Sequence, residues 1–526
     1  MHLRPDSHDR ARKRNVMNAA AAYSPHNPSA HTISALLSRY YWFIVSFFTT
    51  VLMILAMVVD FRRKLWLDEL YTLFSANQKS IWDIIKASLE GCDVAPPLYA
   101  ILVHALLPLI PSEEFAVRLL ATLGYGAMVL LTAAFFRRIF SATYALAAVF
   151  LICLCTSEWA YEGRAYGLVL GFAGYVLFSW QIMAENRSSA WSRLLFVFSA
   201  AMMMALHFQA IFFFAPLFIA DLFRSNRGGR MDWKVWIATG AVIAIVLCGH
   251  YPIIKGYFKF QQYCWAPALW KYFPVILPLN YRVKYVYLLT IAFFTVAVVL
   301  HRRRFAEVAR GLLDEYVWMA FLLYFLSPAV IFTLSVYTTK VYLSRYTTWM
   351  FIGAGGLAIA LFALSVKLSE RIGAVLAGLL LVAVMVVPIQ KVAENPFGAD
   401  EALKQIMGLP HDNTPIVVAH HHVFMELYHY APEQLRHRLA YPLSRDLDIQ
   451  YLGFDTGALL MDAIRKRYHL PVMNYKDILD RYDRFYVLSV QGHYLPSLLQ
   501  QDGRHVKLLH GDTWSALYLV WADKSH

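Results

Sequence analysis

Two adjacent carboxylates interrupt an otherwise apolar stretch, KLWLDELYTLFS, at residues 64–75. Its apolar residues recur with the i, i+3, i+4, i+7 spacing of one helix face: Leu67, Leu70, Tyr71 and Phe74. A polar stripe follows another face of the same helix: Asp68, Thr72 and Ser75. We expect such a helix to lie flat on a membrane surface with the polar stripe turned away from lipid. Carboxylates near lipid are costly and mark functional sites, and a carboxylate can act as a general base, so Asp68 and Glu69 are predicted to be catalytic.

The composition is typical of a membrane protein. The chain has 526 residues, of which 59% are hydrophobic and 16% charged, and its mean hydropathy is +0.46. Ordinary soluble domains have roughly a quarter of their residues charged. The net charge of +13 is explained by Lys and Arg in cytoplasmic loops, and no nucleic-acid recognition module is visible. We therefore predict an α-helical polytopic membrane protein that binds no nucleic acid.

Apolar runs that could span a membrane occur at about eleven places: 40–59, 116–136, 143–156, 164–184, 192–206, 208–223, 233–250, 284–300, 316–336, 347–366 and 372–389. One further run, 96–110, is short and has prolines at both ends. If it does not span, every later basic cluster falls on the cytoplasmic side, as the positive-inside rule requires. These clusters are Arg137-Arg138, Arg187 with Arg193, 224–230, 301–304, and Lys367 with Arg371. The non-spanning alternative is therefore preferred.

This topology divides the chain into three parts. Residues 1–39 are a basic cytoplasmic tail, and the run at 40–59 is an uncleaved signal anchor. Residues 40–390 form the transmembrane domain, whose first external loop, 60–115, carries surface helices. Residues 395–526 form a small external α/β domain with strand-like runs at PIVVAH, RFYVLSV and ALYLVWA and a helix-like segment at 423–438.

Two groups of side chains could form a covalent link or bind a metal. Cys92 and Cys264 fall in predicted external loops, and a bridge between them is left open because the sequence does not supply its geometry. The histidines at 420–422 follow the strand-like run PIVVA, and histidines are common zinc ligands. Successive residues of an extended chain point in opposite directions, so the three rings should not converge, and no metal site is predicted.

The same topology places a second group of ionisable residues outside: Glu162, Arg164, His207, Lys340 and Arg345. Each has a simpler explanation. Glu162 and Arg164 could cap and pair at a helix start, His207 could be an ordinary turn histidine, and the two later cations could be interfacial anchors. Taken together with Asp68-Glu69, however, they set carboxylates opposite cations that can bind a phosphate leaving group. We predict an enzyme that acts on a lipid-linked phosphate at the outer leaflet.

Five short motifs in a fixed order then make a family resemblance visible: WLDEL, DVAPPLY, EGRAYGL, LHF and SRY. The chain resembles the GT-C class of polyprenyl-phosphate-sugar-dependent glycosyltransferases. More narrowly, it is similar to the bacterial relatives of protein O-mannosyltransferases and the lipid A aminoarabinose transferase, over about residues 40–390. It departs from the family before the double proline, where Val94-Ala95 stand in place of the usual His or Glu and Asp93 lies one position further away.

The resemblance implies an inverting sugar transfer from a polyprenyl phosphate to a lipid, glycan or protein of the envelope, outside the bacterial cytoplasmic membrane. Asp68 would orient or deprotonate the acceptor hydroxyl, with Glu69 in support. The departing phosphate would be neutralised by Arg345, Lys340 and Arg164, with Glu162 and His207 beside the substrates. Some relatives bind a divalent cation near the acidic pair, but the sequence shows no ligand set that requires one.

Two other functions compete with this hypothesis. A transporter or flippase of lipid-linked sugars would place its coupling residues near the membrane midplane in repeat-related spans, and the chain has no visible two-fold repeat. A non-enzymatic protein of envelope assembly would suit the external α/β domain but would leave the acidic helix unexplained. Loss of sugar transfer on changing Asp68 would separate the enzyme from both.

Overall fold

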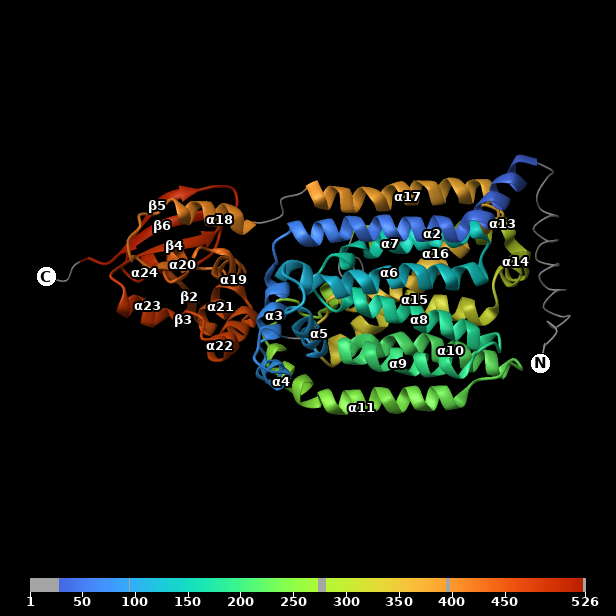
Figure 1. The fold of residues 1–526 in the computed structure, drawn as a ribbon, viewed down its shortest axis with the longest axis horizontal. Coiled ribbons are helices and arrows are strands. Elements are labelled where there is room, and N and C mark those ends of the chain that lie inside the picture. Colours follow the sequence, from blue (N-terminus) through green and yellow to red (C-terminus); the bar gives the residue numbers. More distant parts are fainter. Residues whose placement is uncertain (1–27, 94, 273–280, 394–397, 524–526) are drawn as a thin grey trace.

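The computed structural model describes residues 28–93, 95–272, 281–393 and 398–523. The molecule is elongated, with long, nearly parallel helices over most of its length and a smaller part containing a β-sheet at one end (Figure 1). This arrangement confirms the predicted fold class, a helical polytopic protein with a small C-terminal α/β domain. Of the predicted basic tail, residues 1–27 lie outside the described residues, and residues 28–39 belong to the first helix.

The bundle is built from eleven apolar helices: α2 (Pro28–Arg62), α6 (Glu113–Ile139), α7 (Ala142–Thr156), α8 (Tyr166–Ala184), α9 (Ala190–Leu206), α10 (Ile211–Asn226), α11 (Trp233–Tyr257), α13 (Tyr281–His301), α15 (Glu315–Tyr337), α16 (Phe351–Ser365) and α17 (Glu370–Ala393). They correspond one to one to the predicted runs. Within the described residues, ten segments are long and apolar enough to cross a membrane, and α9, with 17 residues, is shorter. The short helix α14 (Phe305–Leu312) joins α13 to α15 at the end away from the sheet (Figure 1).

Helices α6 and α8 cross closely because glycine faces backbone where they meet. A Cβ atom at Gly124 would collide with the backbone of Leu168, and one at Gly171 would lie 2.5 Å from the carbonyl oxygen of Gly124. Small residues allow membrane helices this approach. The crossing fixes the start of α8 against the part of α6 around Gly124, and the 3-10 helix η1 (Ser157–Ala160) of the preceding loop also packs on α6.

Three short helices lie between the bundle and the sheet-containing part (Figure 1): α3 (Leu67–Ala76), α4 (Ile81–Glu90) and α5 (Leu98–Leu106). Helix α4 is capped by Ser80, whose Oγ accepts from the Asp83 amide at 3.2 Å, and it ends at Gly91 with φ of +86°. Helix α5 has nine residues, about 14 Å of helix, against a hydrocarbon core of ~30 Å. Segment 96–110 therefore forms a short helix at one end of the bundle.

Helix α3 is buried inside the protein. Leu67, Leu70 and Tyr71 are 4%, 0% and 2% exposed, and the Phe74 ring packs on the rings of His429 and Tyr468. The prediction that this apolar face lies in the lipid interface is therefore wrong. The periodicity was read correctly, but the C-terminal domain and the bundle cover the face that the sequence alone assigns to lipid.

The C-terminal domain is a six-stranded mixed sheet with helices. Its strands are β1 (Ile416–Val418), β2 (Leu439–Leu443), β3 (Val472–Asn474), β4 (Arg484–Val490), β5 (His505–Gly511) and β6 (Ser515–Trp521), in the order β3-β2-β1-β4-β6-β5. The first four are parallel, and β6 and β5 are antiparallel. The helices are α18 (Gly398–Met407), α19 (His421–Tyr430), α20 (Glu433–Arg436), α21 (Arg445–Leu452), α22 (Thr456–Tyr468), α23 (Tyr475–Arg481) and α24 (Leu495–Gln501).

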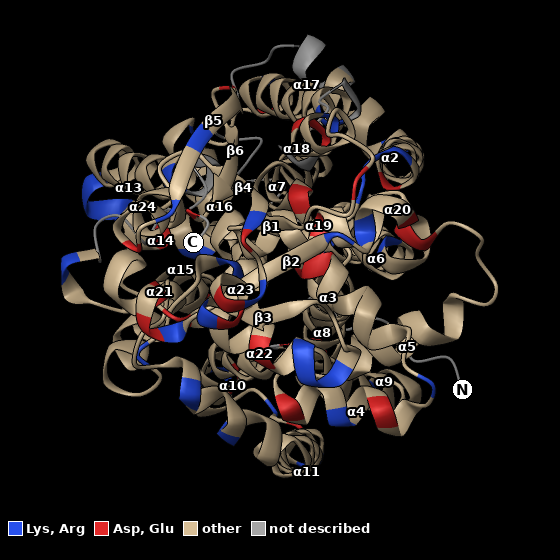
Figure 2. Cartoon of the chain, turned by 90° about the vertical axis from the view of Figure 1, so that its left-hand side faces the viewer, with Lys and Arg blue, Asp and Glu red and all other residues tan. Residues whose placement is uncertain are grey.

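Polar contacts tie this domain to the end of the bundle. The Tyr430 hydroxyl accepts from the Leu65 amide at 2.7 Å, and the hydroxyls of Ser75 and Tyr468 lie 3.1 Å apart. The Asp455 amide donates to the carbonyl of Tyr263 at 3.0 Å. Viewed from the domain end, basic and acidic residues are interspersed over the helices and strands (Figure 2). The surplus positive charge of the chain is therefore not gathered there into a surface for a polyanion.

All five cysteines are free thiols. Burial raises the pKa of Cys92 to about 12, and burial likewise raises the pKa of Cys264. The bridge that the sequence left open between these two residues is not formed.

Candidate active site

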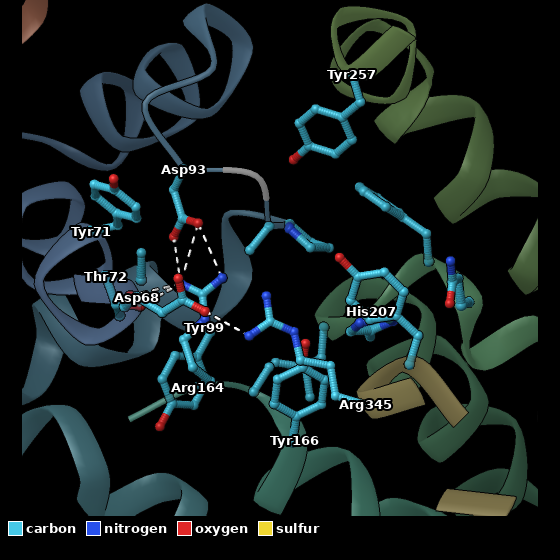
Figure 3. A pocket seen from close by; sticks show the side chains of 18 residues that line it. Asp68, Tyr71, Thr72, Asp93, Tyr99, Arg164, Tyr166, His207, Tyr257 and Arg345 are labelled. Carbon is cyan, nitrogen blue, oxygen red and sulfur yellow. Dashed lines mark hydrogen bonds and ion pairs between the residues drawn. The ribbon is translucent and has the colours of Figure 1, made fainter. Parts of the chain in front are cut away.

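A cavity of about 150 Å³ lies beside α3 (Figure 3), and α3 is at the end of the bundle that meets the C-terminal domain (Figure 1). Its walls come from α3, the segment leading into α5, the loop before α8, the turn between α9 and α10, the end of α11, and the 3-10 helix η6 (Ser344–Met350). The side chains labelled in Figure 3 are Asp68, Tyr71, Thr72, Asp93, Tyr99, Arg164, Tyr166, His207, Tyr257 and Arg345. Polar groups from six distant segments therefore converge on one cavity.

Asp68 stands in the first turn of α3, where the helix dipole favours a negative charge. Arg345 Nη1 donates to its Oδ2 at 2.8 Å, and Arg164 Nη1 donates to its backbone carbonyl at 3.0 Å. Burial raises the pKa of Asp68, but Arg345 and Arg164 together outweigh burial, so the pKa is lowered overall. Asp68 is thus a carboxylate at neutral pH, held by two arginines.

Arg164 joins the loop before α8 to α3 and to a second carboxylate. Its Nη1 lies 3.1 Å from Asp93 Oδ2 and 3.0 Å from Thr72 Oγ1, and its Nη2 lies 3.2 Å from Asp93 Oδ1. Burial raises the pKa of Asp93, and Arg164 offsets this only in part. The sequence argument left Asp93 out of the candidate set; the structure places it in the cavity wall, opposite Asp68 across the Arg164 guanidinium.

Arg345, from η6, has a donor available to a ligand. Besides the bond to Asp68, its guanidinium lies 5.9 Å from the Tyr346 ring, and its side chain is 27% exposed. Its Nε is buried and has no hydrogen-bond partner among the described residues. The guanidinium lines the cavity, and a guanidinium is suited to phosphate oxygens, so an anion in the cavity could pair with it.

His207 lies at the turn between α9 and the 3-10 helix η2 (Phe208–Ala210), within a cage of aromatic rings. The centroids of Tyr166, Tyr346 and Trp349 are 5.4, 5.2 and 4.8 Å from its own. Burial, with Arg345 and Arg164, lowers the pKa of His207 to about 3, and its buried Nδ1 has no partner in the described chain. His207 is therefore a neutral imidazole that can bond to a polar substrate group.

Glu69 does not line the cavity and is fully buried in a separate ion pair with Arg118 of α6. Arg118 Nε and Nη2 donate to its two oxygens at 2.7 and 2.5 Å, and the Gly163 amide donates to Oε1 at 2.6 Å. Arg118 also donates to the backbone carbonyls of Asp60, Arg63 and Lys64. This cluster locks the start of α3 to α6 and to the loop that carries Arg164, so it holds Asp68 in place from behind.

Two other predicted residues also lie outside the cavity wall. Glu162 faces Glu158 and Glu69, and burial together with these carboxylates raises its pKa to about 8. Lys340 is exposed, adopts a left-handed φ of +59°, and donates from Nζ to the carbonyl of Val336 at 2.7 Å. Of the predicted set, the structure thus brings together Asp68, Arg164, His207 and Arg345.

Several tyrosines of the cavity were not identified from the sequence. Tyr166, Tyr257 and Tyr346 line it, and so does Tyr71, which the helix periodicity had assigned to the apolar face. The motif EGRAYGL already contained Tyr166, and the motif SRY contained Tyr346 next to Arg345. The position of an aromatic residue beside a predicted arginine was therefore the available signal.

No family model matches the chain, and no curated protein matches it. The comparison with solved structures does find matches. Together with the bundle and the end cavity, they confirm the predicted resemblance at the level of the fold: the chain has a fold like that of the GT-C class of membrane glycosyltransferases.

The matching structures include ArnT from Cupriavidus metallidurans in the apo state, with a TM-score of 0.55 and 12% identity, covering 90% of this chain and 97% of that one. The same protein bound to undecaprenyl phosphate has a TM-score of 0.53 and 12% identity, with coverages of 91% and 98%. An oligosaccharyltransferase from Archaeoglobus fulgidus, in complex with Zn and sulfate, matches with a TM-score of 0.43, too low to support an argument.

Proposed function

We propose that the chain is a glycosyltransferase that moves a sugar from a polyprenyl-phosphate donor to an acceptor of the bacterial envelope. The observation that carries the proposal is the pairing of the ionised Asp68 with Arg345 inside a cavity at one end of a membrane bundle. A carboxylate that can take a proton and a guanidinium that can take a phosphate are the two groups that such a transfer needs.

The reaction would proceed as one displacement. Asp68 accepts the proton of an acceptor hydroxyl, whose oxygen attacks the anomeric carbon of the donor sugar. The bond from that carbon to the phosphate oxygen breaks, and the phosphate leaves with the electron pair. Attack opposite to the leaving group inverts the anomeric centre. Arg345 and Arg164, both in the cavity wall, neutralise the phosphate.

The polyprenyl chain of the donor would lie among the apolar helices while its phosphate enters the cavity. The fold-level likeness to a protein solved with undecaprenyl phosphate supports this donor class. On the opposite side, the C-terminal domain covers the cavity end of the bundle (Figure 1), so the acceptor would approach from the junction of domain and bundle.

The residues present do not fit a divalent cation. The cavity carboxylates Asp68 and Asp93 are each bound to an arginine, Arg345 and Arg164. Within the described ranges, no group of three or more His, Cys, Asp or Glu residues is arranged to hold a metal ion. The proposed mechanism therefore has no step that passes through a metal.

Replacing Arg345 by Ala should weaken donor binding and slow transfer, and replacement by Lys should keep part of the activity because the charge survives. Loss of Arg345 also removes the main charge that lowers the Asp68 pKa. The acid limb of the pH–rate profile, which in the parent should lie below the usual Asp range of about 4, should therefore move upward in Arg345→Ala. Donor binding and a pH profile equal to those of the parent would make Arg345 an interfacial anchor only.

We further propose that the cavity lies on the outer face of the cytoplasmic membrane. Reporter fusions near residues 112, 160, 270 and 450 should then read as external, and fusions near 140, 227 and 303 as cytoplasmic. A cytoplasmic signal at residue 112 would contradict the external site, because the cavity shares its side of the membrane with that loop.

A further inference from the structure

Four histidine rings gather at one edge of the C-terminal sheet. His420, His421 and His422 follow β1, and His493 follows β4. Ring centroids are 4.8 Å apart for His420 and His422, 4.5 Å for His421 and His422, and 6.4 Å for His420 and His493. The expectation that the three successive rings diverge is wrong, because the chain leaves the extended conformation and starts helix α19 at His421.

The topology of the sheet places a switch point of the strand order at this edge. Strand β1 lies between β2 and β4, all parallel, and the chain returns from β3 across β1 to form β4. The connection that follows β1 runs toward β2, whereas the connection that follows β4 runs toward β6 on the other side. The chain therefore changes direction between the neighbouring strands β1 and β4. In open parallel sheets, ligands bind outside the carboxyl ends of the strands at such a switch point, and here the histidines occupy it.

The cluster is also linked to the cavity wall, because helix α19, whose first turn carries His421 and His422, packs against α3. His422 and Asp68 lie close enough to interact electrostatically: burial lowers the pKa of His422, and Asp68 partly opposes this. This interaction links the sheet edge, through the first turn of α19, to the residue that we propose as the base. A ligand at the edge could therefore extend a group toward Asp68.

The chemistry of the cluster is polar and uncharged. Burial, together with the neighbouring imidazoles, lowers the pKa of His420 to about 3, and burial lowers that of His493 to about 4. His420 Nδ1 is buried without a hydrogen-bond partner in the described part of the chain. A neutral imidazole offers one donor and one acceptor, as does each hydroxyl group, so the cluster matches a polyhydroxylated ligand better than an anion.

A stack of aromatic rings continues from His493. His493 stacks on Tyr494 with centroids 4.5 Å apart and planes 25° apart, and Tyr494 stacks on Tyr451 at 4.8 Å and 11°. Tyr451 is 40% exposed. Such rings present an apolar face with polar tips, which suits the alternating apolar and hydroxylated surfaces of a pyranose.

We propose that this edge, formed by His420, His422, His493 and the Tyr494–Tyr451 stack, binds the saccharide part of the acceptor and directs its hydroxyl to Asp68. The inference rests on the proposed transferase function and narrows its acceptor to a glycan. The polar imidazoles of this edge do not favour binding of a lipid tail. The four histidines and two tyrosines include no cation that would bind a phosphate.

The test is protection of histidines from diethyl pyrocarbonate, which modifies neutral imidazoles, in the full-length protein in nanodiscs. The probe is the water-soluble oligosaccharide fraction released from bacterial envelopes by mild acid. We expect it to protect His420, His422 and His493, and to leave His437, whose side chain is 76% exposed on the same domain, unprotected. Absence of protection, or protection by undecaprenyl phosphate alone, overturns the proposal.

A kinetic experiment complements the footprint. The double variant His420→Ala/His493→Ala should raise the KM for the oligosaccharide acceptor about tenfold, since two modest hydrogen bonds are lost, and should leave the KM for the lipid donor unchanged. His437→Ala is the matched control. An unchanged acceptor KM overturns the assignment. If the parent protein transfers no sugar and the footprint still appears, the transferase proposal fails while the saccharide site stands.

Discussion

Replacing Asp68 by Asn is expected to lower the sugar-transfer rate by about 10²–10⁴-fold, the usual loss on removing a general base. Asparagine keeps the shape of the side chain but cannot accept the hydroxyl proton. Arg345 would lose its carboxylate partner and keep its place in η6, so insertion and folding should persist. The measurement is transfer by purified enzyme from a polyprenyl-phosphate sugar to an envelope acceptor fraction, with thermal unfolding as the check on folding.

The matched control is Asp83→Asn. Asp83 lies on the neighbouring helix α4, outside the cavity wall, where it pairs with Arg467 at 3.0 Å. Surface pairs of this kind contribute at most about 1 kcal/mol, so transfer should remain close to that of the parent. Near-normal transfer by Asp68→Asn would contradict the role of Asp68 as base even if the fold assignment stands.

Replacing Arg118 by Met is expected to destabilise the fold by about 3–5 kcal/mol, because it leaves the buried Glu69 carboxylate without its partner. Both side chains are fully buried, and Arg118 also satisfies the three carbonyls that lead into α3. We expect a lower unfolding temperature of the protein in nanodiscs, with the loss of transfer following the loss of folded protein.

The double variant Arg118→Met/Glu69→Gln tests whether the loss of stability comes from the unpaired charge of Glu69 or from the changed shape of the Arg118 side chain. A neutral amide should recover part of the stability lost in Arg118→Met, since no buried carboxylate is left unpaired. Glu69→Gln alone should reduce transfer less than Asp68→Asn, because Glu69 does not line the cavity. An unfolding temperature of Arg118→Met equal to that of the parent would contradict the proposed lock on α3.

The helical periodicity of residues 64–75 was sufficient to predict α3, and the apolar runs were sufficient to predict the eleven apolar helices. Proline positions and length marked the segment at 96–110 as short. These features depend on interactions between residues close in sequence or on the membrane as a solvent. Both produce a regular pattern of apolar and charged residues in the sequence. The same argument selected seven site residues, and the structure brings four of them into one cavity: Asp68, Arg164, His207 and Arg345.

What the sequence could not supply depends on contacts between distant segments. A pattern of apolar residues shows that one face of α3 is buried. It does not show whether lipid or a distant part of the same chain covers that face. The hydrogen bond from the Leu65 amide to the Tyr430 hydroxyl shows how a domain more than 300 residues later reaches this region. The positions of Asp93 and Glu69 were not predictable for the same reason, because each is set by its arginine partner, Arg164 or Arg118.

The strands of the C-terminal domain were predicted in part. Strands β1, β4 and β6 are continuous apolar runs, whereas β2 contains Pro442 and β5 is largely exposed, so neither has the pattern of a core strand. The hydrogen bonds to neighbouring strands that fix β2 and β5 are not encoded in the sequence of either segment alone.

The spacing of the contacts around α3 sets the order in which the nascent protein can assemble. Arg118 and Glu69 are 49 residues apart, so they can pair as soon as α6 is made. Asp68 and Arg345 are 277 residues apart, and Leu65 and Tyr430 are 365 apart. Contacts between distant residues form late in synthesis and folding. During biogenesis the Asp68 carboxylate therefore has no Arg345 partner until η6 has been made. The apolar face of α3 is covered later still, when the C-terminal domain has been synthesised.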